Sequence, residues 1–179
     1  MSATLRLRIL CLLTLLMSCV TTGSLEAATK PRWPNTFSLV SLDGKKVLRS
    51  ASDFKGQPLL VQFWASWCRS CSGISSELER VVLSHQTSHA SRLQFLSVSI
   101  DETTDEARGT VIQRPSTFLT QHAYHDHQQH LRTSLKVESV PTIVLIHRDG
   151  TILLRKEGHL SASEYLAIKD ALSGLSSSI

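Results

Sequence analysis

Residues 59–71 read LLVQFWASWCRSC, and this stretch decides the fold. The segment 59–64 is apolar except for Gln62, which predicts a strand buried on both faces of a sheet. A helical pattern follows it, with one apolar face formed by Ile74, Leu78, Val81, Val82 and His85. The stretch therefore predicts a central strand that leads directly into a helix, with Cys68 at the helix start and Cys71 one turn further in.

The segments that follow extend this pattern. Residues 93–100 are apolar and predict a second buried strand. Strand, helix and strand in this order imply a parallel pair joined by a right-handed crossover. Residues 143–146 and 152–154 are apolar on either side of Arg148-Asp149-Gly150, which predicts an antiparallel hairpin. A further hairpin is expected from residues 37–40 and their return at 47–48.

Several helices complete the prediction. Ser161 and Glu164 form a capping box that opens a helix to about Leu172. Residues 116–122 and 128–135 are also expected to be helical, whereas the pattern at 102–114 is too polar to assign. The element order predicts an α/β fold, with a mixed central sheet, helices on both faces and an N-terminal β-hairpin extension.

The N-terminus predicts export. Two arginines precede an apolar segment at 9–17, which is too short to span a bilayer core of about 30 Å and is typical of a signal peptide. Leu16-Met17-Ser18-Cys19 resembles a bacterial lipobox and makes Cys19 the expected lipid attachment site. Cleavage near Ala27-Ala28 to a soluble form, or retention as an uncleaved anchor, are the alternatives. All three place the domain outside the cytosol, in the bacterial periplasm.

The chain is accordingly divided into four parts. Residues 1–19 are the signal peptide, 20–35 a tether, 36–174 the folded domain and 175–179 a frayed tail. The formal net charge is +4, and two of the cations lie in the signal peptide. The charge that remains is small and scattered, which argues against a nucleic-acid-binding protein.

Cysteine usage points to redox chemistry. Two of the four cysteines lie in the signal region, so the mature domain holds only Cys68 and Cys71. A zinc site would need two more soft ligands, and a structural disulfide closing so short a loop would constrain the unfolded chain little. The remaining interpretation is that the pair performs thiol-disulfide exchange, in a compartment where disulfides persist.

The expected chemistry divides the roles of the two cysteines. A helix N-terminus lowers the pKa of a thiol, so Cys68 is expected to be the nucleophile and the more buried Cys71 the resolving residue. Arg69 adds a cation and Ser70 a hydroxyl beside Cys68, and both are expected to favour its thiolate. The alternative is an arginine that only points into solvent.

Three motifs carry a family resemblance. FWASWCxxC, the LDGK of residues 42–45 and Val140-Pro141-Thr142 together resemble the thioredoxin superfamily, and most of all its extracytoplasmic TlpA/ResA-type branch. The resemblance spans about residues 37–172 and implies a thioredoxin fold with Pro141 in a cis peptide. It also implies that the backbone of Val140 receives an extended substrate and that Trp67 contributes to the docking surface.

The sequence departs from the family pattern in one respect that affects catalysis. Gln62 stands where family members commonly have an acidic or amide residue, and an amide cannot take a proton. TlpA/ResA-type reductases often carry Glu and Pro after the second cysteine, where this chain has Ile74 and Ser76. No buried carboxylate is therefore evident to deprotonate Cys71.

A histidine cluster leaves a second function open. Its members are His122, His125, His127 and His130. His127 and His130 stand three apart and are expected to share a helix face, and imidazole binds copper and zinc. The alternative function is thus a thioredoxin-fold copper chaperone or assembly factor. A peroxiredoxin would need a Pro-x-x-x-Thr-x-x-Cys setting, which the residues before Cys68 do not supply.

The sequence thus predicts a periplasmic thiol-disulfide oxidoreductase without a cofactor. Its expected partners are cysteine-containing proteins and a redox partner in the membrane or periplasm. By family analogy its tasks include maturation of cytochrome c or of metal-site cysteines. The direction of electron flow stays open, because it depends on the potentials of both partners.

Overall fold

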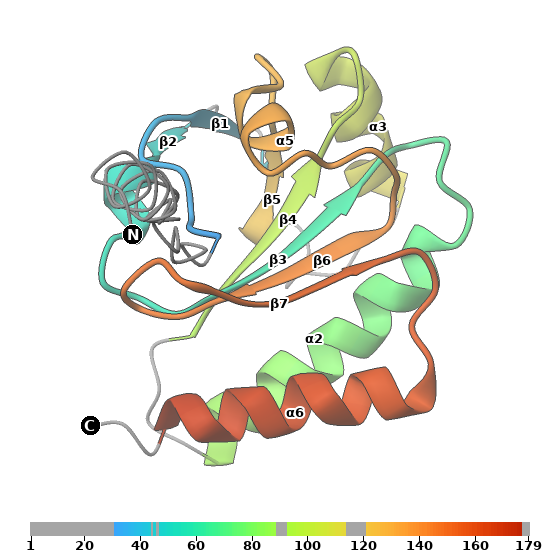
Figure 1. The fold of residues 1–179 in the computed structure, drawn as a ribbon. Helices are drawn as coiled ribbons and strands as arrows, with labels where there is room; N and C mark the ends of the chain where they lie inside the picture. The colour runs from blue at the N-terminus through green and yellow to red at the C-terminus, as the bar shows by residue number, and fades with distance from the viewer. Residues whose placement is uncertain (1–30, 44, 46, 89–92, 114–120, 177–179) are drawn as a thin grey trace, which may run out of the picture.

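A computed structural model describes residues 31–43, 45, 47–88, 93–113 and 121–176. A seven-stranded sheet crosses the molecule in the order β2-β1-β5-β4-β3-β6-β7 (Figure 1). Its strands are β1 (Ser38–Ser41), β2 (Leu48–Ser50), β3 (Leu59–Trp64), β4 (Gln94–Ser99), β5 (Ala123–His125), β6 (Thr142–Ile146) and β7 (Ile152–Glu157). The N-terminal hairpin β1-β2 joins this sheet at one edge and the hairpin β6-β7 forms the other, so the predicted mixed sheet is confirmed.

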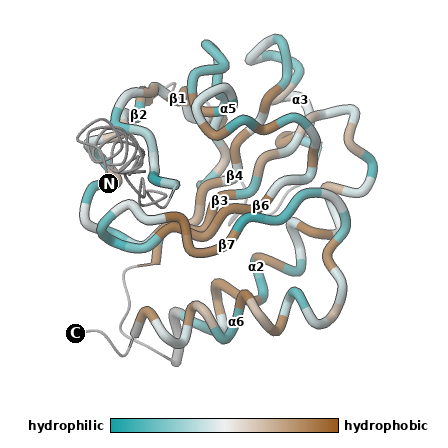
Figure 2. The backbone as a smooth tube through the Cα atoms, viewed as in Figure 1, coloured by the Kyte–Doolittle hydropathy of each residue, from teal (hydrophilic) through white to brown (hydrophobic). Residues whose placement is uncertain are grey.

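The centre of the sheet follows the sequence prediction closely. β3 pairs with β4 in parallel and with β6 antiparallel, and all six residues of β3 are buried. Gln62 lies opposite Ser97 in the parallel register. The apolar residues gather along β3, β4 and β6 (Figure 2). The central strand is therefore covered on both faces, as its run of apolar residues around Gln62 predicts.

Helices cover both faces of the sheet (Figure 1). On one face, α2 (Cys71–Ser88) and α6 (Ala162–Ser176) bury Leu78 and Ile168 against Leu60 of β3. On the other face, the cluster around Phe63 contains residues of α3 (Thr104–Gln113) and α5 (His130–Ser134). A short 3-10 helix, η1 (Ala51–Phe54), links β2 to β3. Alternate residues of one strand thus serve two separate cores.

Three expectations about the helices need correction. α2 begins at Cys71 and not at Cys68, because residues 69–70 still belong to the turn that follows β3. α5 spans only His130–Ser134, since Gln129 has a left-handed backbone with φ of 56°. His127 therefore lies outside this helix and cannot share a face with His130.

Two elements escaped the sequence analysis. α3 occupies the polar segment at 102–114, and β5 follows the helix expected at 116–122, most of which lies outside the described residues. α6 continues to Ser176, beyond the Leu172 that was expected. Among the helices that the structure describes, none has the length and apolar character needed to cross a bilayer.

Candidate active site

The cysteine pair lies at the end of the sheet where β3 leads into α2. Cys68 and Cys71 form a disulfide, and their Cα atoms are 5.5 Å apart. Backbone bonds shape the turn: the N–H of Cys68 donates to the carbonyl of Ala65 at 3.0 Å, and the N–H of Cys71 donates to the carbonyl of Cys68 at 3.3 Å. Cys68 is 5% exposed and Cys71 1%, so the order of burial agrees with the expected roles.

The residues around Cys68 face solvent. Trp67 is 68% exposed, and Arg69 and Ser70 are exposed too. The hydroxyl oxygen of Ser70 lies 3.7 Å from the sulfur of Cys68. Arg69 forms no ion pair within the described part of the chain. The chain on both sides of Cys68 thus presents an exposed indole, an exposed guanidinium and an exposed hydroxyl.

Gln62 lies beneath the pair and is fully buried. Its amide nitrogen donates to the backbone carbonyl of Cys71 at 3.2 Å, and its amide oxygen accepts from the hydroxyl of Ser75 at 3.0 Å. The Ser75 hydroxyl also lies 2.9 Å from the same carbonyl of Cys71. Gln62 therefore ties β3 to the first turn of α2. No carboxylate among the described residues hydrogen-bonds to either cysteine.

Pro141 lies at the same end of the sheet as the cysteines. β3 and β6 are antiparallel, with Phe63 opposite Thr142. Pro141, just before the start of β6, therefore lies at the same end of the sheet as Trp64, the last residue of β3. The Val140-Pro141 peptide is cis, and the carbonyl of Pro141 accepts from the N–H of Gly158 at 2.7 Å. Within the described residues, the backbone N–H and C=O of Val140 have no hydrogen-bond partner. They are free to pair with an extended chain.

An open groove runs beside the pair, between the starts of α2 and α6. Its volume is about 870 Å³, and Arg69, Ile74, His159, Leu160 and Leu166 are among its lining residues. The groove therefore combines apolar side chains with the charged side chains of Arg69 and Glu77.

Asp101 is the site residue that the sequence analysis missed. It is 1% exposed and follows β4. Its carboxylate accepts from the N–H of Ser66 at 2.9 Å and from the Ser66 hydroxyl at 2.8 Å, and also from the Ser99 hydroxyl at 2.7 Å. These bonds fix the residue two before Cys68. The parallel pairing of the two strands was a usable signal, because the residues that follow parallel neighbours meet at one edge.

The histidines do not gather into a site. His125 is 1% exposed, and both ring nitrogens are engaged, one with the hydroxyl of Thr104 at 2.8 Å and one with the carbonyl of Asp101 at 3.0 Å. His122 is half-buried against Phe95, and burial lowers its pKa. His127 and His130 are exposed. In the chain as described, no three side chains are placed to hold a metal ion.

Comparison with known proteins agrees with this geometry. A family model described as thioredoxin-like matches residues 56–152. Thioredoxin from Pseudomonas aeruginosa is 29% identical over 114 residues, which cover 64% of this chain and 78% of that protein.

Solved structures share the whole fold. One from Chlorobium tepidum, described as a thiol:disulfide interchange protein DsbE, has a TM-score of 0.67 and 25% identity, covering 82% of this chain and 96% of that one. The exposed lipoprotein thioredoxin Etrx1 from Streptococcus pneumoniae has a TM-score of 0.59 and 23% identity, covering 78% of this chain and 99% of that one. At this identity the second likeness concerns the fold alone.

Proposed function

Because this chain belongs to the thioredoxin-like family and is a thiol-disulfide oxidoreductase, we propose that it exchanges disulfides with extracytoplasmic proteins through Cys68 and Cys71. The observation that carries the proposal is the disulfide at the end of β3, with an exposed indole beside it. It is supported further by the unpaired backbone of Val140 at the same end of the sheet.

The exchange proceeds in two steps. In the reduced enzyme the Cys68 thiolate attacks a substrate disulfide, forming a mixed disulfide and releasing one substrate thiolate, which takes up a proton. The thiolate of Cys71 then attacks the sulfur of Cys68, and the second substrate thiolate leaves. Two electrons pass to the substrate, and the enzyme is left with the Cys68–Cys71 bond seen in the structure. Oxidation of a substrate dithiol follows the same steps in reverse.

The substrate is held by backbone and surface contacts. An extended segment around the substrate cysteine pairs with the backbone of Val140, next to Pro141, as a short added strand. Trp67 packs against it, and the groove beside Arg69 receives the residues that follow. Backbone hydrogen bonds do not depend on the side chains of the substrate, so this arrangement suits several different substrate proteins.

Three residues tune the pair. Arg69 and Ser70 favour the thiolate of Cys68. Gln62 positions Cys71 through its backbone carbonyl, and it has no proton to exchange as an acid or base. The proton of the Cys71 thiol therefore passes to solvent or to the leaving substrate thiolate.

The place of action follows from the N-terminal sequence. The short apolar segment and the lipobox-like residues before Cys19 support export and lipid attachment on the periplasmic side of a membrane. Substrates there include proteins whose cysteines must be reduced before haem or metal is inserted, so maturation of cytochrome c or of metal sites is a fitting task.

Trapping tests the proposal. The Cys71→Ser variant lacks the resolving thiol and should accumulate mixed disulfides through Cys68, which separate on non-reducing gels and are identified by mass spectrometry. The Cys68→Ser variant is the matched control and should trap nothing. A properly folded Cys71→Ser protein that forms no adducts in the periplasm would rule out exchange with protein substrates.

A further inference from the structure

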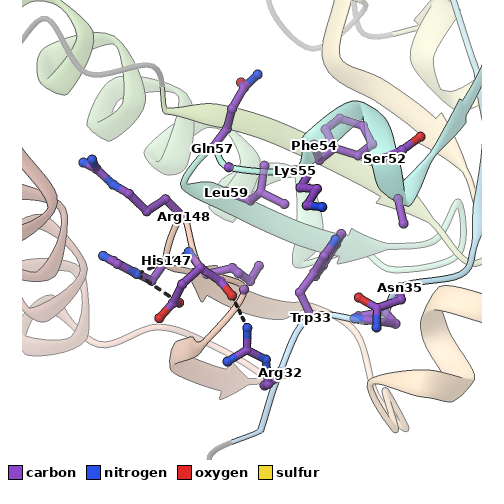
Figure 3. Close-up of a pocket in the computed structure, with 16 residues that line it drawn as sticks. Arg32, Trp33, Asn35, Ser52, Phe54, Lys55, Gln57, Leu59, His147 and Arg148 are labelled. Atoms are coloured by element: carbon purple, nitrogen blue, oxygen red, sulfur yellow. Dashed lines mark hydrogen bonds and ion pairs between the residues drawn. The ribbon is translucent and has the colours of Figure 1, made fainter.

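A second pocket lies at the opposite end of the sheet from the cysteines. It has a volume of about 620 Å³ and is formed where β3 begins and β6 ends, near Leu59 and Ile146 (Figure 3). The N-terminal segment and η1 close its other side, through Trp33 and Phe54. Because Cys68 follows the far end of β3, this pocket takes no part in the exchange reaction.

One wall of the pocket is fixed by backbone pairing. The N–H of Trp33 donates to the carbonyl of Gly150 at 2.7 Å, and the N–H of Ile152 donates to the carbonyl of Pro31 at 2.9 Å. Gly150 has φ of +86°, a left-handed conformation that favours glycine. The Trp33 ring packs edge-on against Phe37 with centroids 5.1 Å apart. The wall is therefore preformed and places an indole on the pocket.

The pocket has an excess of positive charge. Arg32, Lys55 and Arg148 all line it, and none of them forms an ion pair among the residues that the structure describes. Arg32 and Arg148 donate only to backbone carbonyls, those of Asp149 and Leu175. The lining thus carries three cations and the one carboxylate of Asp149, and the guanidinium of Arg148 lies toward α6, where it donates to Leu175.

Asp149 is the one acidic side chain of the lining, and its carboxylate is bonded within its own turn. The carboxylate of Asp149 accepts from the N–H of Thr151 at 2.8 Å and lies 3.0 Å from the ring nitrogen of His147. These bonds hold the pKa of Asp149 well below its usual range. The carboxylate therefore stays ionised, and its bonding partners lie in the turn between β6 and β7.

The lining also contains polar atoms that lack partners. Within the described residues, the buried Nε1 of Trp33 and Nε of Arg148 donate to nothing, and Oε1 of Gln57 accepts nothing. Buried polar groups are almost always hydrogen-bonded, so such a concentration in one pocket is unusual. Both unpaired nitrogens are donors, and because they are buried, a shift of the Trp33 or Arg148 side chain would be needed to bring them to an acceptor oxygen of a ligand.

We propose that this pocket binds the phosphate headgroup of an anionic phospholipid and thereby holds the domain with its cysteine end away from the membrane. The source of the phosphate is argued from the chain length. The pocket wall begins at Pro31, twelve residues after Cys19, and twelve residues reach at most about 40 Å. A lipid on Cys19 keeps the pocket within reach of the bilayer surface, where tryptophan side chains also favour the interface.

The inference rests on the proposed lipid attachment, so the experiment measures lipid attachment at Cys19 and headgroup binding in the pocket separately. The mature protein is purified from bacterial membranes, and the mass of its N-terminal peptide reports whether Cys19 carries lipid. The protein is then placed in nanodiscs of phosphatidylcholine, alone or mixed with phosphatidylglycerol; if it carries no lipid, vesicles of the same compositions are used. The rate at which a water-soluble reagent acetylates Lys55 is measured by mass spectrometry, with exposed Lys136 near Pro141 as reference.

Headgroup binding should slow acetylation of Lys55 severalfold in the anionic bilayer and leave Lys136 unchanged. Arg32→Gln and Arg148→Gln should each weaken headgroup binding about fivefold, the usual effect of one cation near an anionic membrane. Arg49→Gln, which removes an exposed cation outside the pocket, is the matched control and should change nothing. All three variants should retain disulfide exchange.

Three results would overturn the inference. Equal protection of Lys55 and Lys136 would mean that the anionic bilayer acts on the whole surface. An Arg49→Gln effect as large as that of Arg148→Gln would mean the same. Protection of Lys55 by soluble glycerol phosphate in phosphatidylcholine discs, with none from phosphatidylglycerol, would make the ligand a free phosphate compound.

Discussion

The carboxylate of Asp101 holds the backbone N–H and the hydroxyl of Ser66, at 2.9 and 2.8 Å, although the two residues are 35 positions apart. Ser66 lies two residues before Cys68, the proposed nucleophile. The active-site loop is thus anchored to the end of the neighbouring strand and not only to the helix that follows it.

Replacing Asp101 should loosen this loop. Asp101→Ala leaves the N–H of Ser66 and the hydroxyl of Ser99 without an acceptor, which should lower the free energy of unfolding by about 1–3 kcal/mol. Ser66→Ala removes only one of these bonds and should cost less. Urea unfolding of the oxidised proteins measures both. An Asp101→Ala protein as stable as the wild type would show that the carboxylate does not anchor the loop.

Removing the cation beside Cys68 should weaken the nucleophile. In the reduced protein, Arg69→Ala should raise the pKa of Cys68 and lower its thiolate fraction at neutral pH severalfold, because a nearby cation favours the charged form. Thiolate absorbance followed against pH gives the value. Lys136→Ala serves as the control, since it also removes one exposed cation. Identical titration curves for Arg69→Ala and wild type would mean that Arg69 only points into solvent.

Replacing the two tryptophans before Cys68 should have different effects, on stability for Trp64 and on substrate binding for Trp67. Trp64 is 5% exposed, so Trp64→Ala should destabilise the fold by about 3–5 kcal/mol. Trp67 is 68% exposed, so Trp67→Ala should change stability by no more than about 0.5 kcal/mol. Its KM for a protein disulfide should instead rise about tenfold, as for an interface anchor. Insulin reduction gives the kinetics, and an unchanged KM would remove Trp67 from the docking surface.

Acid should weaken the capping box at the start of α6. The pKa of Glu164 is lowered from 4.5 to about 2, mainly by Lys156 and also by the N–H of Ser161. A carboxyl whose folded pKa is depressed stabilises the protein above its unfolded pKa and loses that contribution as pH falls through the folded value. Glu164→Gln should therefore be less stable than wild type at pH 6, with the difference shrinking between about pH 4.5 and pH 2.

Ser161→Ala provides the comparison for this effect. It removes the hydroxyl that donates to the Glu164 carboxylate and accepts from the Glu164 N–H, while the charged carboxylate keeps Lys156 and the Ser161 N–H, so only part of its cost should follow the titration of Glu164. Denaturant unfolding of the wild type, Glu164→Gln and Ser161→Ala across this pH range measures how each free energy of unfolding depends on pH. A deficit of Glu164→Gln that stays constant with pH would contradict the assignment.

The sequence predicted the parts of the fold whose residues carry a strong local signal. The apolar run of β3 and the periodic face of α2 are long and regular, so their type and neighbours were correct. β5 has only three residues, and its His125 is buried by contacts with Thr104 and Asp101 that no local pattern contains. α3 was missed because only Ala107 and Val111 of its ten residues are buried.

The site divides in the same way. The spacing of Cys68 and Cys71 and the distant Pro141 are visible in the sequence, because each is a motif of fixed residues. Asp101 was passed over as the end of a strand, since its role arises only when β4 is paired beside β3. Tertiary pairing therefore supplies the part of the site that single motifs do not encode.

The edge strand β7 has a consequence for how this protein treats unfolded chains. Arg155 fastens β7 to the loop before Pro141 by donating to the carbonyls of Leu135 and Lys136, and Glu157 pairs with Arg155 on the same strand. A flat, unfastened edge would let a bound chain continue to pair and to nucleate aggregation. β7 is thus both charged and tied back along the edge of the sheet that it forms. An unfolded chain should therefore find β7 a poor template for strand pairing.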